Sequence, residues 1–439
     1  PAPHRALSKP AGPRSFRQVK EAEETAPIFQ YAGKAAKRKD RVFVWGFCYS
    51  GALGIPSFVK PDVGWKKPRR IQSTPYRLET EEKLLSAQFV LGVLLSSNPT
   101  SFTKLVGSLQ FPGLTTWSWK NIQLLGMGTK GYEYVLEPSP IPLPLEKPQQ
   151  TRVLQVSCGR AHSLVLTDSE GVFTMGNNSY GQCGRKVVED ETYSESHLIH
   201  QLNEFDSRVV QVVCGQDHSL FRTQKGSVYA CGWGADGQTG LGHYNITSVP
   251  TKLRGDIAGV NIIQVSSYGD CCLAVSDEGD VFGWGNSEYL QLASVTETTQ
   301  VNVPRHLPFK IGKIKEAACG GTGNLVLTEE GNVFVWGYGI LGKGPNLLET
   351  AVPEMIPLSL FGCSDSNPDA RVAHVRCGLS HFAALTNRGE LFVWGKNLRG
   401  CLGTGRKEDQ YFPWRVTVPG EVVDVACGVD HMVSMVKSF

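Results

Sequence analysis

The side chains best suited to chemistry lie in short turns with the pattern Cys-Gly-x-x-His or a close variant. Imidazole and carboxylate groups in such turns can hold a charged partner through hydrogen bonds and ion pairs. An arginine in the first turn adds a cation that suits an acidic partner or an RNA phosphate. The candidate partner-binding residues are Arg160, His162, Asp217, His218, His381, Asp430 and His431.

A structural role competes with the binding role for these residues. A histidine that recurs at one position of a repeat usually holds the repeats together, here by hydrogen bonds to neighbouring backbone. The aspartates are better candidates for binding, because other turns have Ala161, Thr322 or Ser380 in their place. For Arg160 the alternative is a solvated surface arginine.

Covalent catalysis finds no support in the remaining motifs. The sequence has no Gly-x-Ser-x-Gly, His-Glu-x-x-His or P-loop pattern and no carboxylate pair at a useful spacing. Its 12 cysteines include no Cys-x-x-Cys, and five of them (158, 214, 319, 377 and 427) recur as Cys-Gly at one position of a repeat, as small buried residues would. We therefore expect no metal, no cofactor and no enzymatic reaction, which leaves a binding function.

The turns are positioned by a repeat of about fifty residues. Five segments align without a gap, and in each a small residue precedes a Trp-Gly-like pair by the same distance. The pairs of small residue and pre-glycine residue are Cys158 and Met175, Cys214 and Cys231, Ser267 and Trp284, Cys319 and Trp336, and Cys377 and Trp394. A constant core with connectors of variable length is typical of a stacked repeat.

Each unit predicts strands on both sides of these turns. One strand is expected before the cysteine, one after the histidine and one ending at the Trp-Gly pair, with a glycine hairpin turn between the second and third. A fourth strand in the connector completes a blade whose apolar faces only neighbouring blades can cover. The pre-glycine tryptophans are expected in the core. The predicted fold is all-β, a propeller of radially arranged blades.

The two ends of the chain predict how the ring closes. The last unit, at Cys427, ends at Phe439 before its tryptophan strand, and residues 41–46 supply such a strand with no unit before it. We expect the N- and C-terminal strands to pair in one blade, which removes the exposed edges of an open array.

Residues 84–131 lie where one more unit belongs but lack both Cys-Gly and His-Ser. Spacing from Met175 predicts a glycine-ended strand at Leu124–Gly128, with Phe89–Leu95 as an apolar strand of the same unit. The expected count is then seven blades within residues 41–439, the one at 84–131 being degenerate.

Positive charge is concentrated at the N-terminus. Residues 1–41 hold ten Lys and Arg against four Asp and Glu, whereas the rest of the chain holds 34 against 37. We expect residues 1–40 to be a flexible basic tail, which suits peripheral contact with anionic lipid or RNA. The first twenty residues contain no acid, as after a mitochondrial transit peptide, although an ordinary basic arm is the alternative. The start at Pro1 indicates missing upstream residues, and no apolar run is long enough to span a membrane.

The pattern of Cys-Gly-x-x-His-Ser, a hairpin glycine, Val-Phe-x-Trp-Gly and Gly-Gln-x-Gly resembles the regulator-of-chromosome-condensation repeat family. The resemblance covers residues 41–439 except 84–131. Kelch repeats would show a recurring Gly-Gly doublet and WD40 repeats Gly-His with Trp-Asp, and neither recurs. With its basic N-terminus, the chain looks most like a mitochondrial, exchange-factor-like member of the family.

This resemblance implies guanine-nucleotide exchange without covalent chemistry. The founding member uses one propeller face to hold a small GTPase in a conformation with a weakened phosphate and Mg²⁺ site, and the Asp-His pairs match that face. The implied partner is a mitochondrial GTPase, of the dynamin-like fusion type or a ribosome or translation GTPase, in the matrix or on the matrix side of the inner membrane. The founding member also inserts a β-hairpin wedge, and the connectors Lys186–Phe205 and Gly344–Arg371 show no such hairpin.

A second hypothesis is a non-catalytic scaffold for mitochondrial ribosomal RNA maturation and ribosome assembly. In that case the basic tail and a propeller face would hold RNA or RNA-modifying proteins. Both hypotheses remain open from the sequence, with exchange ahead because of the family resemblance.

Overall fold

The computed structural model describes residues 40–48, 53–59, 68–78, 89–93, 105–109, 115–119, 139–141, 143–189, 191 and 198–437. The predicted tail up to Lys39 and the predicted strand Leu124–Gly128 lie outside these residues. Within the described part, no helix is both long and apolar enough to pass through a membrane.

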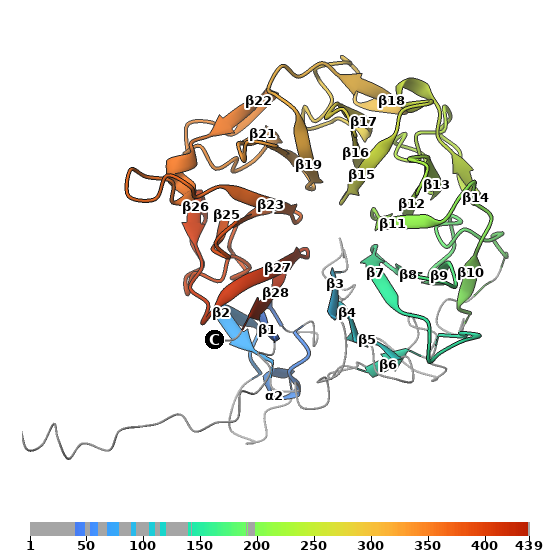
Figure 1. Ribbon diagram of the computed structural model, residues 1–439, viewed down its shortest axis with the longest axis horizontal. Coiled ribbons are helices and arrows are strands. Elements are labelled where there is room, and N and C mark those ends of the chain that lie inside the picture. Colours follow the sequence, from blue (N-terminus) through green and yellow to red (C-terminus); the bar gives the residue numbers. More distant parts are fainter. Residues whose placement is uncertain are drawn as a thin grey trace, which may run out of the picture. The chain divides into compact units, whose positions relative to one another are not determined.

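Antiparallel four-stranded sheets form most of the regular structure and are arranged radially, as predicted (Figure 1). Five blades are built from consecutive strands. The first two contain β7 (Val153–Cys158), β8 (His162–Thr167), β9 (Val172–Gly176) and β10 (His200–Leu202), and β11 (Val209–Cys214), β12 (His218–Thr223), β13 (Val228–Gly232) and β14 (Thr247–Lys252). The third and fourth contain β15 (Ile262–Ser267), β16 (Cys271–Ser276), β17 (Val281–Asn286) and β18 (Gln300–Leu307), and β19 (Ile314–Cys319), β20 (Gly323–Thr328), β21 (Val333–Tyr338) and β22 (Glu349–Ile356). The fifth contains β23 (Val372–Cys377), β24 (His381–Thr386), β25 (Leu391–Gly395) and β26 (Gln410–Arg415).

The sixth blade joins the two ends of the chain. Its strands are β27 (Glu421–Cys427), β28 (His431–Lys437), β1 (Asp40–Phe47) and β2 (Ile71–Arg77), in the order β2-β1-β28-β27. β1 pairs with β28 from Asp40 opposite Lys437 to Gly46 opposite His431. The predicted closure by the terminal strands is confirmed.

The predicted count of seven blades was wrong: six blades carry the repeat. The third strands hold the predicted pre-glycine positions 45, 175, 231, 284, 336 and 394, but none holds the position predicted near residue 125. A further sheet, β3 (Phe89–Val93), β4 (Leu105–Leu109), β5 (Thr115–Trp119) and β6 (Ser139–Ile141), packs through β3 against β7 and β27. The predicted apolar strand Phe89–Leu95 is present as β3, the innermost strand of this sheet, but the sheet lacks the Cys-Gly turn of the repeat. Spacing alone, without a Cys-Gly turn, could not assign its other strands.

Short helical turns complete the described elements. They are α2 (Pro56–Val59), η3 (Gly255–Ile257) and η4 (Leu358–Phe361). The last two lie in connectors between an outer strand and the next inner strand, away from the Cys-Gly turns.

Buried tryptophans join each blade to the one before it. The indole Nε1 of Trp284 donates to the carbonyl of Gln238 at 3.0 Å, that of Trp336 to Gln291 at 2.8 Å, and that of Trp45 to Cys401 at 2.8 Å. All three side chains are fully buried, so each bond replaces one that water would make in the unfolded chain. The acceptors Gln238, Gln291 and Cys401 each stand six residues after the glycine that ends the third strand, so this connector position receives the tryptophan of the next blade.

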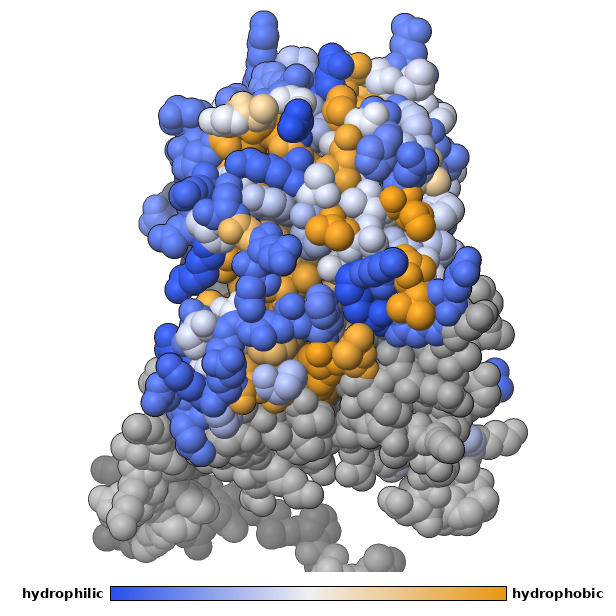
Figure 2. Space-filling model, turned by 90° about the vertical axis from the view of Figure 1, so that its right-hand side faces the viewer, coloured by the Kyte–Doolittle hydropathy of each residue, from blue (hydrophilic) through white to orange (hydrophobic). Residues whose placement is uncertain are grey.

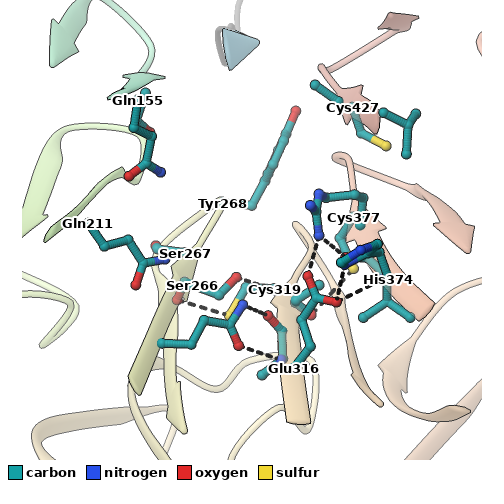
Figure 3. Close-up of a pocket in the computed structure, with 18 of the residues that line it drawn as sticks. Gln155, Gln211, Ser266, Ser267, Tyr268, Glu316, Cys319, His374, Cys377 and Cys427 are labelled. Carbon is teal, nitrogen blue, oxygen red and sulfur yellow. Dashed lines mark hydrogen bonds and ion pairs between the residues drawn. The ribbon is translucent and has the colours of Figure 1, made fainter. Parts of the chain in front are cut away.

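The inner strands are clamped together around a central cavity of about 730 Å³ (Figure 3). The Gln211 side chain both donates to and accepts from the backbone of Val265 in the next blade, at 2.9 and 3.0 Å. Gln264 does the same with Ala317, at 2.9 and 2.7 Å. Glu316 holds this position one blade on, accepts from Val375 at 3.3 Å and pairs with Arg376 and His374. These bonds fix the angle between neighbouring blades.

The outermost strands are protected from pairing with other chains. β2, β14, β18, β22 and β26 each contain one proline, which cannot donate to an added strand: Pro75, Pro250, Pro304, Pro353 and Pro413. On the side of the ring that carries β14 and β18, apolar residues form small groups separated by hydrophilic ones (Figure 2). The outer edge of the ring is therefore not an extended apolar surface on this side.

Replacement of Trp336 by Phe should cost more stability than replacement of Trp394 by Phe. Both tryptophans are fully buried, but Trp336 donates to Gln291, whereas the Trp394 indole nitrogen has no acceptor among the described residues. Leaving the Gln291 carbonyl buried without a donor costs about 1–3 kcal/mol. Urea unfolding of the two variants measures the difference, and equal losses would contradict the role given to the hydrogen bond.

Candidate functional site

One face of the ring gathers all the Cys-Gly-x-x-His-type turns and the connectors that follow the third strands. In each repeat blade the first connector residue donates its backbone N–H to a turn carbonyl. Examples are Trp233 to Asp217 at 2.9 Å, Asn286 to Asp270 at 2.8 Å and Phe47 to Asp430 at 2.8 Å. We call this surface the turn face.

The predicted histidines lie beneath this face. His162, His218, His381 and His431 are each at most 1% exposed. His162 Nε2 bonds Ser219 Oγ of the next blade at 2.9 Å, and His218 Nε2 lies 3.2 Å from Cys272 Sγ of the blade after that. These contacts support the structural alternative, in which the histidine joins neighbouring blades.

Burial keeps the His218 and His381 rings neutral, and the position of these rings explains the turn glycines. Burial lowers the pKa of His218 to about 3 and that of His381 to about 4. A Cβ at Gly215 would lie 1.9 Å from the His218 ring, and one at Gly378 would lie 2.3 Å from the His381 ring. The glycine of Cys-Gly is therefore required because the histidine ring occupies the space of its side chain.

Arg160 and Asp217 lie together on the turn face. They form an ion pair between neighbouring blades through both the Nε and Nη2 atoms of the guanidinium. Asp217 is 8% exposed, and burial raises its pKa while Arg160 opposes the rise. Arg160 is thus neither an isolated cation nor a fully solvated one.

Asp270 is a third aspartate at this position, which the sequence comparison missed. It stands in the turn where Asp217 stands one blade earlier, but Cys271 replaces the histidine that marked the other turns. Its carboxylate accepts from Gln238 Nε2 at 3.1 Å. Burial and the nearby Asp236 carboxylate raise its pKa to about 6. The gap-free alignment was the signal that could have found it.

Asp430 pairs with an arginine that no motif indicated. Arg399, in the connector between β25 and β26, lies 3.5 Å from Asp430 and places its guanidinium 4.4 Å from the centre of the Phe47 ring. Burial raises the pKa of Asp430, and Arg399 opposes the rise. The site joins residues from both ends of the chain.

The Arg399–Phe47 contact belongs to a series between neighbouring connectors. Tyr180 packs on Trp233 with ring centres 4.6 Å apart, and Tyr289 stacks on Tyr338 at 5.9 Å. In each pair, the fourth connector residue of one blade covers the first of the next. Gln182 and Gln291 hold two of these fourth residues by accepting their backbone N–H groups, at 2.9 and 2.8 Å.

Apolar side chains also pack together among the turns of this face. Tyr268 replaces the glycine of Cys-Gly in its turn and is 6% exposed in a cluster with Val429, with Leu379 packed against it.

This arrangement is suited to binding charged groups of a partner. All three aspartates are partly desolvated, but Asp217 already pairs with Arg160 and Asp430 with Arg399. Asp270 has no ion pair among the described residues, so its carboxylate is the most strongly drawn to a partner's cation. No group of His, Cys, Asp and Glu in the described residues has an arrangement that could hold a metal ion. The connector Gly344–Arg371 holds β22, η4 and one isolated bridge, Ser364 with Asn367, in the part that the structure describes.

The regulator of chromosome condensation (RCC1) repeat model matches residues 169–222, 225–275, 278–327 and 388–435, and a second model of this repeat matches 153–182, 209–238 and 372–401. The chain is 67% identical to the mouse "RCC1-like G exchanging factor-like protein", with 100% of this chain and 96% of the mouse protein covered. The crystal structure of human WBSCR16 superposes with a TM-score of 0.85 at 67% identity, covering 92% of this chain and 100% of that one. Prp20p of Saccharomyces cerevisiae, at 18% identity and a TM-score of 0.71, covers 92% of this chain and 93% of its own and shares the fold.

Replacement of Asp270 by Asn should stabilise the protein in a pH-dependent manner. Folding raises the pKa of this carboxyl from 3.8 to about 6. Its contribution to stability is full below the lower value and is lost as pH rises through the higher one. Asp270→Asn should therefore gain at most about 3 kcal/mol at about pH 7.5 and much less at about pH 4.5. Urea unfolding at both pH values measures this, and an equal gain at both would contradict it.

Proposed function

Because the chain belongs to the regulator of chromosome condensation (RCC1) repeat family, we propose that it is a guanine-nucleotide exchange factor for a mitochondrial GTPase. The name of its mouse relative, an RCC1-like G exchanging factor-like protein, supports this activity class. The acid-free composition of residues 1–20 supports the mitochondrial location, in the matrix or on the matrix side of the inner membrane.

The observation that carries the proposal is the set of partly buried aspartates on the turn face. Asp217, Asp270 and Asp430 occupy the same position in three turns, and burial raises the pKa of each. Asp270 gains free energy when a partner's lysine or arginine neutralises it, whereas at Asp217 and Asp430 such a cation replaces Arg160 or Arg399. A cation drawn from the nucleotide site of a GTPase to this face would no longer hold the phosphates.

Exchange then follows from differential binding. A face that binds the nucleotide-free GTPase more tightly than the nucleotide-bound one lowers the affinity for GDP by the same factor. The blade-to-blade bonds of Trp284, Trp336 and Gln211 keep the face rigid, so the GTPase must adapt to it. No bond is made or broken in this scheme.

Release of fluorescent GDP from purified mitochondrial GTPases tests the proposal. The panel contains the dynamin-like fusion GTPase, translation factors and ribosome-assembly GTPases. The protein should accelerate release from one of them, and Asp217→Ala or Asp430→Ala should slow that release at least about tenfold, for a loss of about 1.4 kcal/mol.

Asp168→Ala provides the matched control. Asp168 pairs with Arg152 at 2.9 Å but lies in the β8–β9 hairpin turn, on the opposite face, so its loss should leave release unchanged. If no GTPase responds at micromolar protein, exchange is excluded. The scaffold hypothesis would then be tested by recovery of crosslinked mitochondrial ribosomal RNA with salt-sensitive binding.

A further inference from the structure

The connector between β25 and β26, residues 396–409, is the basic part of the turn face. It contains Lys396, Arg399, Arg406 and Lys407 against Glu408 and Asp409. Within the described residues, its one ion pair is that of Arg399 with Asp430. The Asp409 carboxylate accepts the backbone N–H of Asn397 at 2.8 Å, so it is engaged within the connector. Three exposed cations are left facing solvent.

An exposed leucine stands among these cations. Leu398 is 76% exposed, more than any other large hydrophobic residue in the described part of the chain. Its neighbour Asn397 is fully buried, accepts from the Leu402 N–H at 2.9 Å and donates to the Arg406 carbonyl at 3.0 Å. The connector is therefore held in one shape, and Leu398 loses little conformational freedom when a partner covers it.

The opposite part of the same face is acidic. The connectors after β13 and β17 carry Asp236 and Glu288, beside the turn residues Asp217 and Asp270. The turn face thus has a negative sector on the blades of β11–β18 and a positive sector on the blade of β23–β26. A uniformly anionic surface, such as a membrane or RNA, would be repelled by the first sector while attracted to the second.

We propose that connector 396–409 docks an acidic surface of the partner GTPase, with Leu398 seated in an apolar pocket of that surface. The proposal rests on the proposed function and adds where and how the partner is held. Carboxylates of the partner meet Lys396, Arg406 and Lys407, which fixes its orientation on the face, while Leu398 supplies the desolvated contact at the centre. In the other sector, Asp270 has no ion pair among the described residues and remains available for a cation of the same partner.

Kinetics with the responding GTPase test this docking site. Leu398→Glu, and separately Arg406→Glu with Lys407→Glu, should raise the half-saturating concentration for GDP release at least about tenfold while the maximal rate is unchanged. The charge variant should also weaken the dependence of that concentration on salt. All replaced side chains are exposed, and unchanged thermal unfolding verifies that the variants fold.

Matched controls lie elsewhere on the ring. Val352→Glu changes a valine that is 56% exposed on the outer strand β22, and Lys310→Glu with Lys313→Glu changes two exposed lysines in the connector between β18 and β19, on the opposite face. These variants should match the unmodified protein. Equal effects of control and connector variants would overturn the proposal.

Binding of the nucleotide-free GTPases of the panel, measured in parallel, separates the two proposals. If a GTPase binds the unmodified protein but not the Leu398→Glu variant, and its GDP release is not accelerated, exchange is overturned and the docking site is supported. Accelerated release that Leu398→Glu leaves unchanged would support exchange and overturn the docking site. No binding by any GTPase, or binding to cardiolipin vesicles that Leu398→Glu abolishes, would overturn the docking site as well.

Discussion

The pairing of β1 with β28 is the constraint on which the rest of the structure depends. It places Phe47, near the start of the chain, beside the turn of Asp430 near its end. Arg399 then binds both, so this part of the turn face exists only in the closed ring. The same pairing leaves Trp45 opposite Met432 and directs its indole to Cys401 of the preceding blade. This part of the turn face is therefore assembled by the same strand pairing that closes the ring.

Locking the blades and binding a partner are assigned to different residues of the same repeat. Where a turn has a histidine, the ring is buried, and His162 and His218 contact side chains of the neighbouring blade. The residue one position earlier in the turn varies between the blades: Ala161, Asp217, Asp270, Thr322, Ser380 and Asp430. Each blade-to-blade hydrogen bond contributes only about 1 kcal/mol. Because such bonds recur around a closed ring, unfolding must break them together. The variable residue can therefore change without disturbing the fold.

The sequence was sufficient where a repeated motif imposed one geometry. Equal spacing from Cys158 to Met175 and in the other four units predicted the strands, and the incomplete unit at Cys427 predicted the closing pair. The sequence was insufficient to assign strands where the Cys-Gly motif is absent. Residues 84–131 have no turn from which to count, so a strand was predicted at Leu124–Gly128 while β5 ends at Trp119. Asp270 was overlooked because Cys271 follows it, and the Arg160–Asp217 and Arg399–Asp430 pairs depend on blade angles that one sequence does not contain.

The charged residues of the turn face occupy two kinds of position in the repeat, which differ in burial. The turn position is partly buried, so a carboxylate there has a raised pKa and gains from a nearby guanidinium, as Asp217 does from Arg160 and Asp430 from Arg399. The connector position is exposed, so Lys396, Arg406 and Lys407 stay solvated without partners of their own. A partner gains little from the solvated cations alone and much from replacing water around the desolvated acids. The exposed cations and Leu398 are therefore suited to orienting a partner, and the partly buried aspartates to discriminating between its conformations.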